Sequence, residues 1–105
     1  MGVRENKVEK YLDAEVTKLG GLTRKWVCPG HDGVPDRIVI LHGRVVFVEV
    51  KTVEGRLSNA QVREHARLKG VEALVVTVSG SAEVDKLVKK LNTRTGLSRS
   101  GAYGP

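Results

Sequence analysis

Cysteine and aromatic residues are scarce in this sequence of 105 residues, which has one Cys, one Trp, one Phe and two Tyr. The single thiol, Cys28, excludes an internal disulfide and a zinc site built from several cysteines. The longest apolar runs, such as Val45 to Val48, are far shorter than the ~20 residues of a membrane-spanning helix. The first residues carry no apolar signal core. We therefore expect one cytoplasmic domain with an aliphatic core and no membrane partner.

Acidic side chains are also in the minority, because 18 Lys and Arg stand against 12 Asp and Glu and give a formal charge of +6. Such a balance favours polyanionic partners, since binding releases counterions from phosphates. Basic small proteins are common, however, so charge alone is a weak indication. The few aromatic residues are dispersed and form no ladder on which single strands would stack. Duplex or branched DNA is the expected partner.

Periodic apolar positions predict seven elements of secondary structure. A short turn at His42 and Gly43 predicts an antiparallel hairpin, and a helix between the last two strands predicts a crossover to a parallel neighbour. We expect an α/β fold of order αβββαβ(α), with a mixed central sheet flanked by helices. The domain is expected over residues 1–91, followed by a flexible, polar and basic tail over 92–105. The expected helices are 5–19, 59–69 and 82–91, and the expected strands 22–27, 36–41, 44–51 and 71–78.

Asp36, Glu49 and Lys51 form the sharpest chemical pattern. Side chains alternate along a strand, so Glu49 and Lys51 share a side, about 7 Å apart. Residues 36 and 49 lie at equal distances from the hairpin turn, which predicts that they pair. Two carboxylates on adjacent strands can share Mg²⁺ or Mn²⁺, and the Val50 carbonyl can add an oxygen ligand. A lysine beside them can orient water and stabilise charge on a phosphate.

These residues also allow a simpler interpretation, in which Glu49 and Lys51 form a salt bridge at a strand end and Asp36 caps a loop. Short triplets of an acid, any residue and a lysine are common by chance, which favours that interpretation for the triplet alone. The context favours a site instead. The triplet ends a central apolar strand, and Pro35 rigidifies the approach to Asp36.

Three segments together resemble a VRR-NUC domain, a branch of the PD-(D/E)xK nuclease superfamily. They are Gly33 to Arg37 (GVPDR), Val46 to Lys51 (VFVEVK) and Leu57 to Gln61 (LSNAQ). The resemblance covers roughly residues 4–91, and stand-alone members of the family resemble phage-encoded proteins. It implies a restriction-endonuclease-like core and a metal-dependent DNA endonuclease that uses Mg²⁺ or Mn²⁺ and no nucleotide cofactor.

The resemblance also implies roles for individual residues. Asp36 and Glu49 would be metal ligands, Lys51 the catalytic lysine and Gln61 a polar residue that supports the site. His65 lies four residues after Gln61 on the same helical face and could assist, although we expect a surface histidine there.

The family also places an acid on the first helix, where both Glu5 and Glu9 are candidates. The spacing of acids and apolar residues in the motif favours Glu5. The distance to Gly20, compared with archaeal junction resolvases, favours Glu9. We take Glu5 as the acid beside the metal and keep Glu9 as the alternative.

Basic residues near the expected site are candidates for DNA contacts. Arg63 and Arg67 share a helical face from which they could bind phosphates. His31 lies in the loop before Asp36 and is otherwise expected to be a solvated loop residue. The full set of expected DNA contacts is Arg24, Lys25, His31, Arg37, Arg63 and Arg67.

The family resemblance implies that stand-alone members form symmetric dimers and act on four-way junctions. A two-fold dimer would match the two-fold symmetry of such a junction. We therefore expect a homodimer that selects branched DNA, such as Holliday junctions, in the cytoplasm of a phage's host cell. One alternative is a non-catalytic DNA-binding subunit of the same fold in phage replication or packaging. Another is a basic RNA-binding or protein-interaction module in which the triplet is a coincidence.

Overall fold

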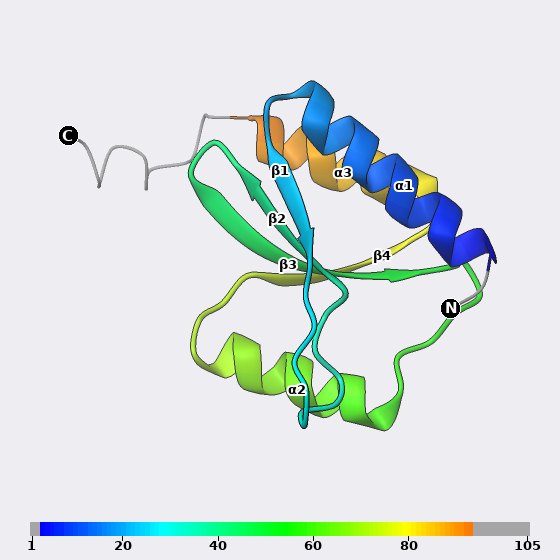
Figure 1. Cartoon of the computed structure of the whole chain (residues 1–105), viewed down its shortest axis with the longest axis vertical. Helices are drawn as coiled ribbons and strands as arrows, with labels where there is room; N and C mark the ends of the chain where they lie inside the picture. The colour runs from blue at the N-terminus through cyan, green and yellow to red at the C-terminus, as the bar shows by residue number, and fades with distance from the viewer. Residues whose placement is uncertain (1–2, 94–105) are drawn as a thin grey trace.

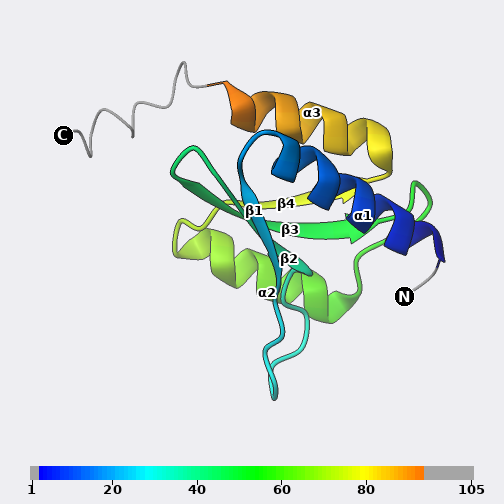
Figure 2. The same cartoon turned by 45° about the horizontal axis from the view of Figure 1, so that its top comes forward.

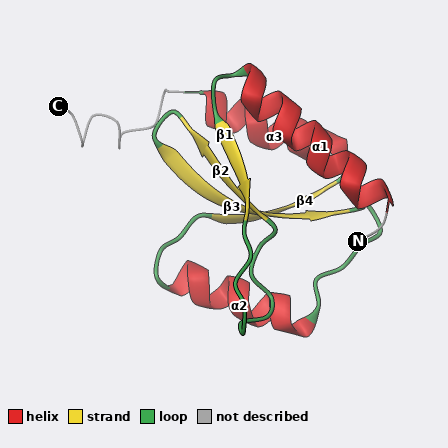
Figure 3. Cartoon of the chain, viewed as in Figure 1, coloured by secondary structure: helices red, strands yellow, loops and turns green. Residues whose placement is uncertain are grey.

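The computed structural model describes residues 3–93, which form one sheet with helices on both faces (Figure 1). Figure 3 shows α1 and α3 together on one face and α2 on the other. The expected αβββαβα order is confirmed. Among the described residues, no helix is long and apolar enough to cross a membrane. The elements are α1 (Val3–Lys18), β1 (Leu22–Lys25), β2 (Arg37–Leu41), β3 (Arg44–Lys51), α2 (Asn59–Gly70), β4 (Val75–Ser79) and α3 (Ser81–Asn92).

The sheet has the strand order β1-β2-β3-β4, so β3 is central as expected. β1, β2 and β3 pair antiparallel, whereas β3 and β4 pair parallel, which makes the sheet mixed. The hairpin register sets Arg37 opposite Val48. The next position along both strands therefore sets Asp36 against Glu49, as the equal distances from the turn predicted.

The hydrophobic core lies between the sheet and the pair of helices α1 and α3. Val46, Val48 and Val50 of β3 are almost fully buried there. Because side chains alternate along a strand, Glu49 and Lys51 must point to the opposite face, toward α2. The helices and the other strands contribute Leu12, Val16, Val39, Leu41, Val78, Val84, Leu87, Val88 and Leu91 to the core.

One strand begins later than its sequence predicted. The pattern over residues 71–78 predicts a strand, but β4 starts at Val75. The amides of Val71 and Ala73 both donate to the carbonyl of Leu68, and Glu72 adopts a positive φ of 68°. Residues 71 and 72 are therefore the turn that ends α2. Leu74 leads into β4, because its carbonyl accepts a hydrogen bond from the amide of Phe47 on β3. The tail predicted over 92–105 lies outside the described residues from position 94 onward.

The loop between β1 and β2 descends beside α2, as two views of the chain show (Figures 1 and 2). Gly33 in this loop has a φ of +89°, and a Cβ atom there would lie 2.4 Å from the carbonyl oxygen of Ala60 on α2. Only glycine fits both the backbone conformation and this close approach. The loop is thereby held against the first turn of α2, and it delivers Asp36 to the end of β2.

Gly33→Ala should destabilise the fold more than Gly30→Ala. Gly30 has a similar φ of +80°, but a Cβ atom there would meet nothing within 4 Å, so it is a matched control for backbone strain alone. The left-handed conformation costs a non-glycine residue roughly 1–2 kcal/mol, and Gly33→Ala adds a backbone clash. Chemical denaturation measures both losses. Equal losses in the two variants would contradict the close packing of the loop on α2.

Candidate active site

Asp36 and Glu49 come together where β2 begins and β3 ends. The Oδ2 atom of Asp36 accepts a hydrogen bond from the amide of Val50 at 3.0 Å, which fixes the carboxylate beside β3. The N–H and C=O groups of one strand residue point to the same side. The Val50 carbonyl therefore also faces Asp36. The structure thus brings together two carboxylates and one backbone oxygen, as the sequence predicted.

Glu49 is a carboxylate in a strongly unfavourable place for a charge. It is 1% exposed. Burial, followed by the negative charge of Asp36 and a hydrogen bond with it, raises the pKa of Glu49 to about 8, while Lys51 acts in the opposite direction. The two carboxyl groups are close enough to disfavour full ionisation of both. A proton or a cation is needed to balance their charge.

Lys51 lies on the same side of β3 as Glu49, with its Nζ atom 3.7 Å from Oε2 of Glu49. The ion pair of the simpler interpretation therefore exists. However, Glu49 is covered by a helix instead of standing at a solvated strand end, and the Lys51 side chain keeps 15% of its surface exposed. Lys51 places a positive charge beside the carboxylate pair.

Gln61 on α2 binds Glu49 directly. Its Nε2 atom donates to Oε2 of Glu49 at 2.9 Å. Its Oε1 atom accepts a hydrogen bond from the backbone amide of Ser58. The backbone amide of Gln61 donates to the Ser58 hydroxyl, which completes a capping box at the start of α2. The side chain of Gln61 thus both caps α2 and positions the Glu49 carboxylate.

Both candidate acids of α1 act electrostatically on the carboxylate pair. The charge of Glu5 contributes to the raised pKa of Glu49, and the charge of Asp36 contributes to the raised pKa of Glu9, whose main cause is burial. Glu9 already has a partner, because the Arg37 guanidinium lies 3.4 Å from its Oε1 atom and 2.9 Å from Oδ2 of Asp13. Glu5 is partly exposed, and Arg37 forms no ion pair with it.

The expectation of a surface position for His65 is wrong. This residue is 4% exposed, and its Nε2 atom lies 3.8 Å from Oε1 of Glu49. Burial lowers the pKa of His65. Its spacing of four residues from Gln61 was the signal for its position, since both side chains occupy the face of α2 that covers Glu49.

The basic residues expected to contact DNA fall into three groups. Arg63, Arg67 and His31 surround a polar cavity of about 180 Å³ between the β1–β2 loop and α2. His31 and Arg67 both bind the buried carboxylate of Glu64, at 2.9 Å and 3.0 Å, so Glu64 ties the loop to the helix. Sequence reasoning missed Glu64.

Arg24 and Lys25 lie exposed on β1. Arg37 differs from all the other basic candidates. Only 17% of its side chain is exposed, and its guanidinium is held by the carboxylates of α1. Arg37 is therefore half-buried, and its ion pairs join α1 to β2.

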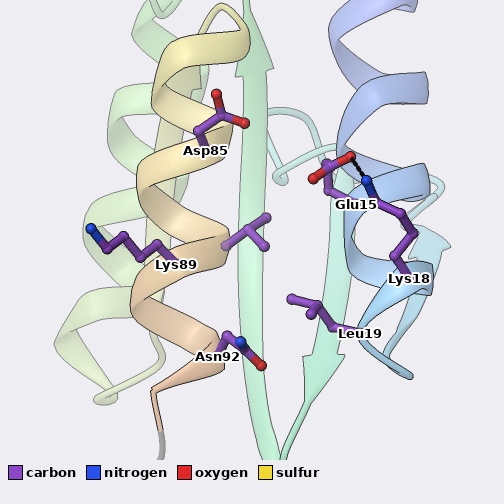
Figure 4. Close-up of a pocket in the computed structure, with 7 residues that line it drawn as sticks. Glu15, Lys18, Leu19, Asp85, Lys89 and Asn92 are labelled. Carbon is purple, nitrogen blue, oxygen red and sulfur yellow. Dashed lines mark ion pairs between the residues drawn. The ribbon is translucent and has the colours of Figure 1, made fainter.

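A second cavity of about 330 Å³ lies between α1 and α3 (Figure 4). Its lining includes Glu15 and Lys18, which form an ion pair, and Asp85 and Lys89 across from them. These helices cover the face of the sheet opposite to that of Glu49. The cavity is therefore separate from the carboxylate pair.

Within residues 3–93, no three His, Cys, Asp or Glu side chains form a group that could hold a metal ion by themselves. The donors at Asp36 and Glu49 still fit a hard cation. Mg²⁺ is commonly bound through one or two carboxylates, with water and substrate phosphates completing its shell. The oxygen-only donor set and the unbalanced charge of the pair both match that chemistry.

Comparisons with known proteins identify relatives of this chain. No model of a protein family matches it. The chain is 40% identical over 91 residues to "Putative nuclease p44" of Acyrthosiphon pisum secondary endosymbiont phage 1, which covers 86% of this chain and 97% of that protein.

Solved structures give the same result. A structure described as "VRR_NUC domain" is 39% identical and has a TM-score of 0.78, with 84% of this chain and 97% of that chain covered. A second, "VRR_NUC domain protein", shares the fold at a TM-score of 0.67 and 15% identity over 87% of this chain and 89% of that chain. The restriction-endonuclease-like fold expected from the sequence is confirmed. This chain belongs to the VRR-NUC family of nucleases, as a member of the phage type.

Proposed function

We propose that this protein is a metal-dependent endonuclease that hydrolyses phosphodiester bonds of DNA at Asp36, Glu49 and Lys51. The observation that carries the proposal is the pairing of the buried Glu49 carboxylate with Asp36, whose charge is unbalanced without a proton or a cation. Membership of a nuclease family and the resemblance to a phage nuclease agree with it. A purely binding subunit would have no need for such a costly arrangement.

Asp36, Glu49 and the Val50 carbonyl would hold Mg²⁺ or Mn²⁺, with Glu5 as a further acid. When bound, the cation would stabilise negative charge on the scissile phosphate and lower the pKa of an attacking water. Glu5 is preferred to Glu9 because the charge of Glu5 acts on Glu49, whereas Arg37 lies 3.4 Å from one oxygen of Glu9. Lys51 would orient the water or the phosphate beside the carboxylate pair, and Gln61 would keep the Glu49 carboxylate in a fixed orientation.

The DNA backbone would run along the α2 face of the sheet. Arg63 and Arg67 border the polar cavity beside this face, with His31 across from them. These side chains and the exposed Arg24 and Lys25 would bind phosphates on either side of the cut, which positions the duplex without reading its sequence.

We further propose that the protein acts as a homodimer on branched DNA such as Holliday junctions. The register sets Leu22, Ile40 and Val45 side by side across three strands, and their exposed fractions are 50%, 36% and 47%. They form an apolar row on the α2 face of the sheet, on the same strand face as Glu49. A second copy of the chain is the occupant that would bury this row and supply a second site for the opposing strand.

Asp36→Asn and Lys51→Met should each reduce DNA cleavage in Mg²⁺ or Mn²⁺ by about 100-fold or more, as losses of charge-stabilising groups do. The asparagine keeps an oxygen that can accept from Val50, so the fold should persist. Gel assays on labelled junction, flap and linear DNA measure cleavage, and binding in EDTA should change little. Lys86→Met on α3 is the control. Full cleavage by either variant would refute the assignment, and DNA binding without cleavage by the unaltered protein would favour a non-catalytic subunit.

Glu49 should make the metal-free fold less stable as pH rises. Its pKa is about 8 in the folded chain and near the ordinary value of 4.5 when unfolded. Between these values the folded state binds more protons, so stability falls with increasing pH. The melting temperature in EDTA should fall by several degrees from about pH 5 to about pH 8, since about 1 kcal/mol corresponds to roughly 4–8 °C in a domain of this size.

The variant Glu49→Gln should remove most of that fall. Cations bind the ionised pair, so Mn²⁺ should raise the melting temperature of the unaltered protein far more above pH 8 than below about pH 6, and should have little effect on Glu49→Gln. Parallel pH profiles for the two proteins would show that Glu49 is not the group responsible.

Ile40→Glu should convert a dimer to a monomer, because it places a charge in the centre of the apolar row. Val53→Glu is a matched control, since Val53 is 78% exposed and lies outside the row. Sedimentation equilibrium gives the oligomeric state, and junction cleavage should become uncoupled between the two strands in the monomer. An unaltered protein that is monomeric, or an Ile40→Glu variant that still dimerises, would contradict the proposed interface.

A further inference from the structure

Two buried polar atoms face each other beneath α2 without a hydrogen bond. They are Nε2 of His65 and Oε1 of Glu49, which are 3.8 Å apart. Neither atom has a hydrogen-bond partner in the described part of the chain. A buried polar atom without a partner costs roughly 1–3 kcal/mol. Two such atoms that face each other indicate a contact that a small movement would close.

The surroundings of Glu49 show how that movement would act. Gln61 already binds the other carboxylate oxygen, Oε2, at 2.9 Å, and the capping box with Ser58 fixes Gln61 in place. His65 follows Gln61 by one helical turn, so both side chains reach the same carboxylate from one rigid helix. The separation of 3.8 Å between these two atoms is longer than the usual 2.7–3.2 Å of an N–H···O hydrogen bond. A shift of about 1 Å or less would bring them within hydrogen-bond distance.

We propose that His65 is a positioning residue for Glu49. Its Nε2–H group donates to Oε1 of Glu49 when the site is engaged, so that α2 holds both oxygens of the carboxylate. The plane of the carboxylate is then fixed relative to Asp36. Each oxygen keeps a lone pair for a cation, because an ionised carboxylate oxygen can accept more than one interaction. This inference rests on the proposed metal-dependent function.

The magnitude of the effect follows from similar supporting contacts in metal sites. Removal of a group that orients a ligating carboxylate commonly reduces metal affinity or activity by about 10–100-fold. Arg63 and Arg67, which are proposed to bind phosphates, lie exposed on α2, whereas His65 is buried against the sheet. The loss should therefore appear in metal binding and in kcat, and the KM for DNA should stay within about 2-fold.

The test compares His65→Met with His65→Gln in the full chain. Methionine fills the space without a donor, whereas glutamine can place an amide N–H near the position of Nε2. Calorimetric titration with Mn²⁺ alone, without DNA, measures metal binding. His65→Met should weaken it by about 10–100-fold, and His65→Gln should recover most of the loss. Ala66→Met, on the exposed side of α2, is the control for a new methionine on this helix.

Thermal unfolding in EDTA shows that each variant is folded before titration. Unchanged Mn²⁺ affinity and kcat in His65→Met would overturn the inference. Equal losses in the Met and Gln variants would also overturn it, because they would indicate packing without a hydrogen bond. In either case Asp36→Asn would still abolish metal binding, so the proposed function would stand. If the unaltered protein binds no Mn²⁺, both proposals fail.

Discussion

The burial of Glu49 next to Asp36 is the constraint on which the rest of this structure depends. The Glu49 carboxylate is 1% exposed and lies beside a second carboxylate, and the backbone fixes it in this unfavourable position. The hairpin register sets residues 36 and 49 together, and the Val50 amide holds Asp36 in place. The same arrangement that makes the metal-free pair unfavourable is the basis of the proposed cation site.

The two faces of the sheet have different roles, because one packs the hydrophobic core and the other carries the candidate site. Val46, Val48 and Val50 alternate with Glu49 and Lys51, so the face toward α1 and α3 provides the apolar core and the face toward α2 carries the site. α2 contributes polar contacts instead of core side chains: Gln61 binds Glu49, and Glu64 ties the β1–β2 loop to the helix through His31. A small chain can thus keep a costly site because the opposite face supplies its stability.

Much of this arrangement was predictable from local patterns, and the failures have physical causes. Alternation and a short turn predicted the hairpin and the Asp36–Glu49 pairing correctly. Residues 71–74 were wrongly predicted as strand because the apolar Val71, Ala73 and Leu74 gave no sign of the left-handed turn at Glu72. The spacing of His65 from Gln61 indicated its face on α2, but the burial of His65 and the ion pairs of Arg37 with α1 depend on how separate elements pack. Gln61 was identified only through the family resemblance, although the spacing of Ser58 and Gln61 is itself a capping-box signal.

The most direct test of the central idea is the position of a metal ion relative to these two carboxylates. Crystals grown with Mn²⁺ and measured near the manganese absorption edge give an anomalous signal only where manganese binds. The structure predicts one strong peak in contact with Asp36 and Glu49, beside the Val50 carbonyl, and the nearer of Glu5 and Glu9 would be identified in the same map. A strong peak elsewhere, with Asp36 and Glu49 sharing a proton and no metal at a pH above 8, would contradict the assignment.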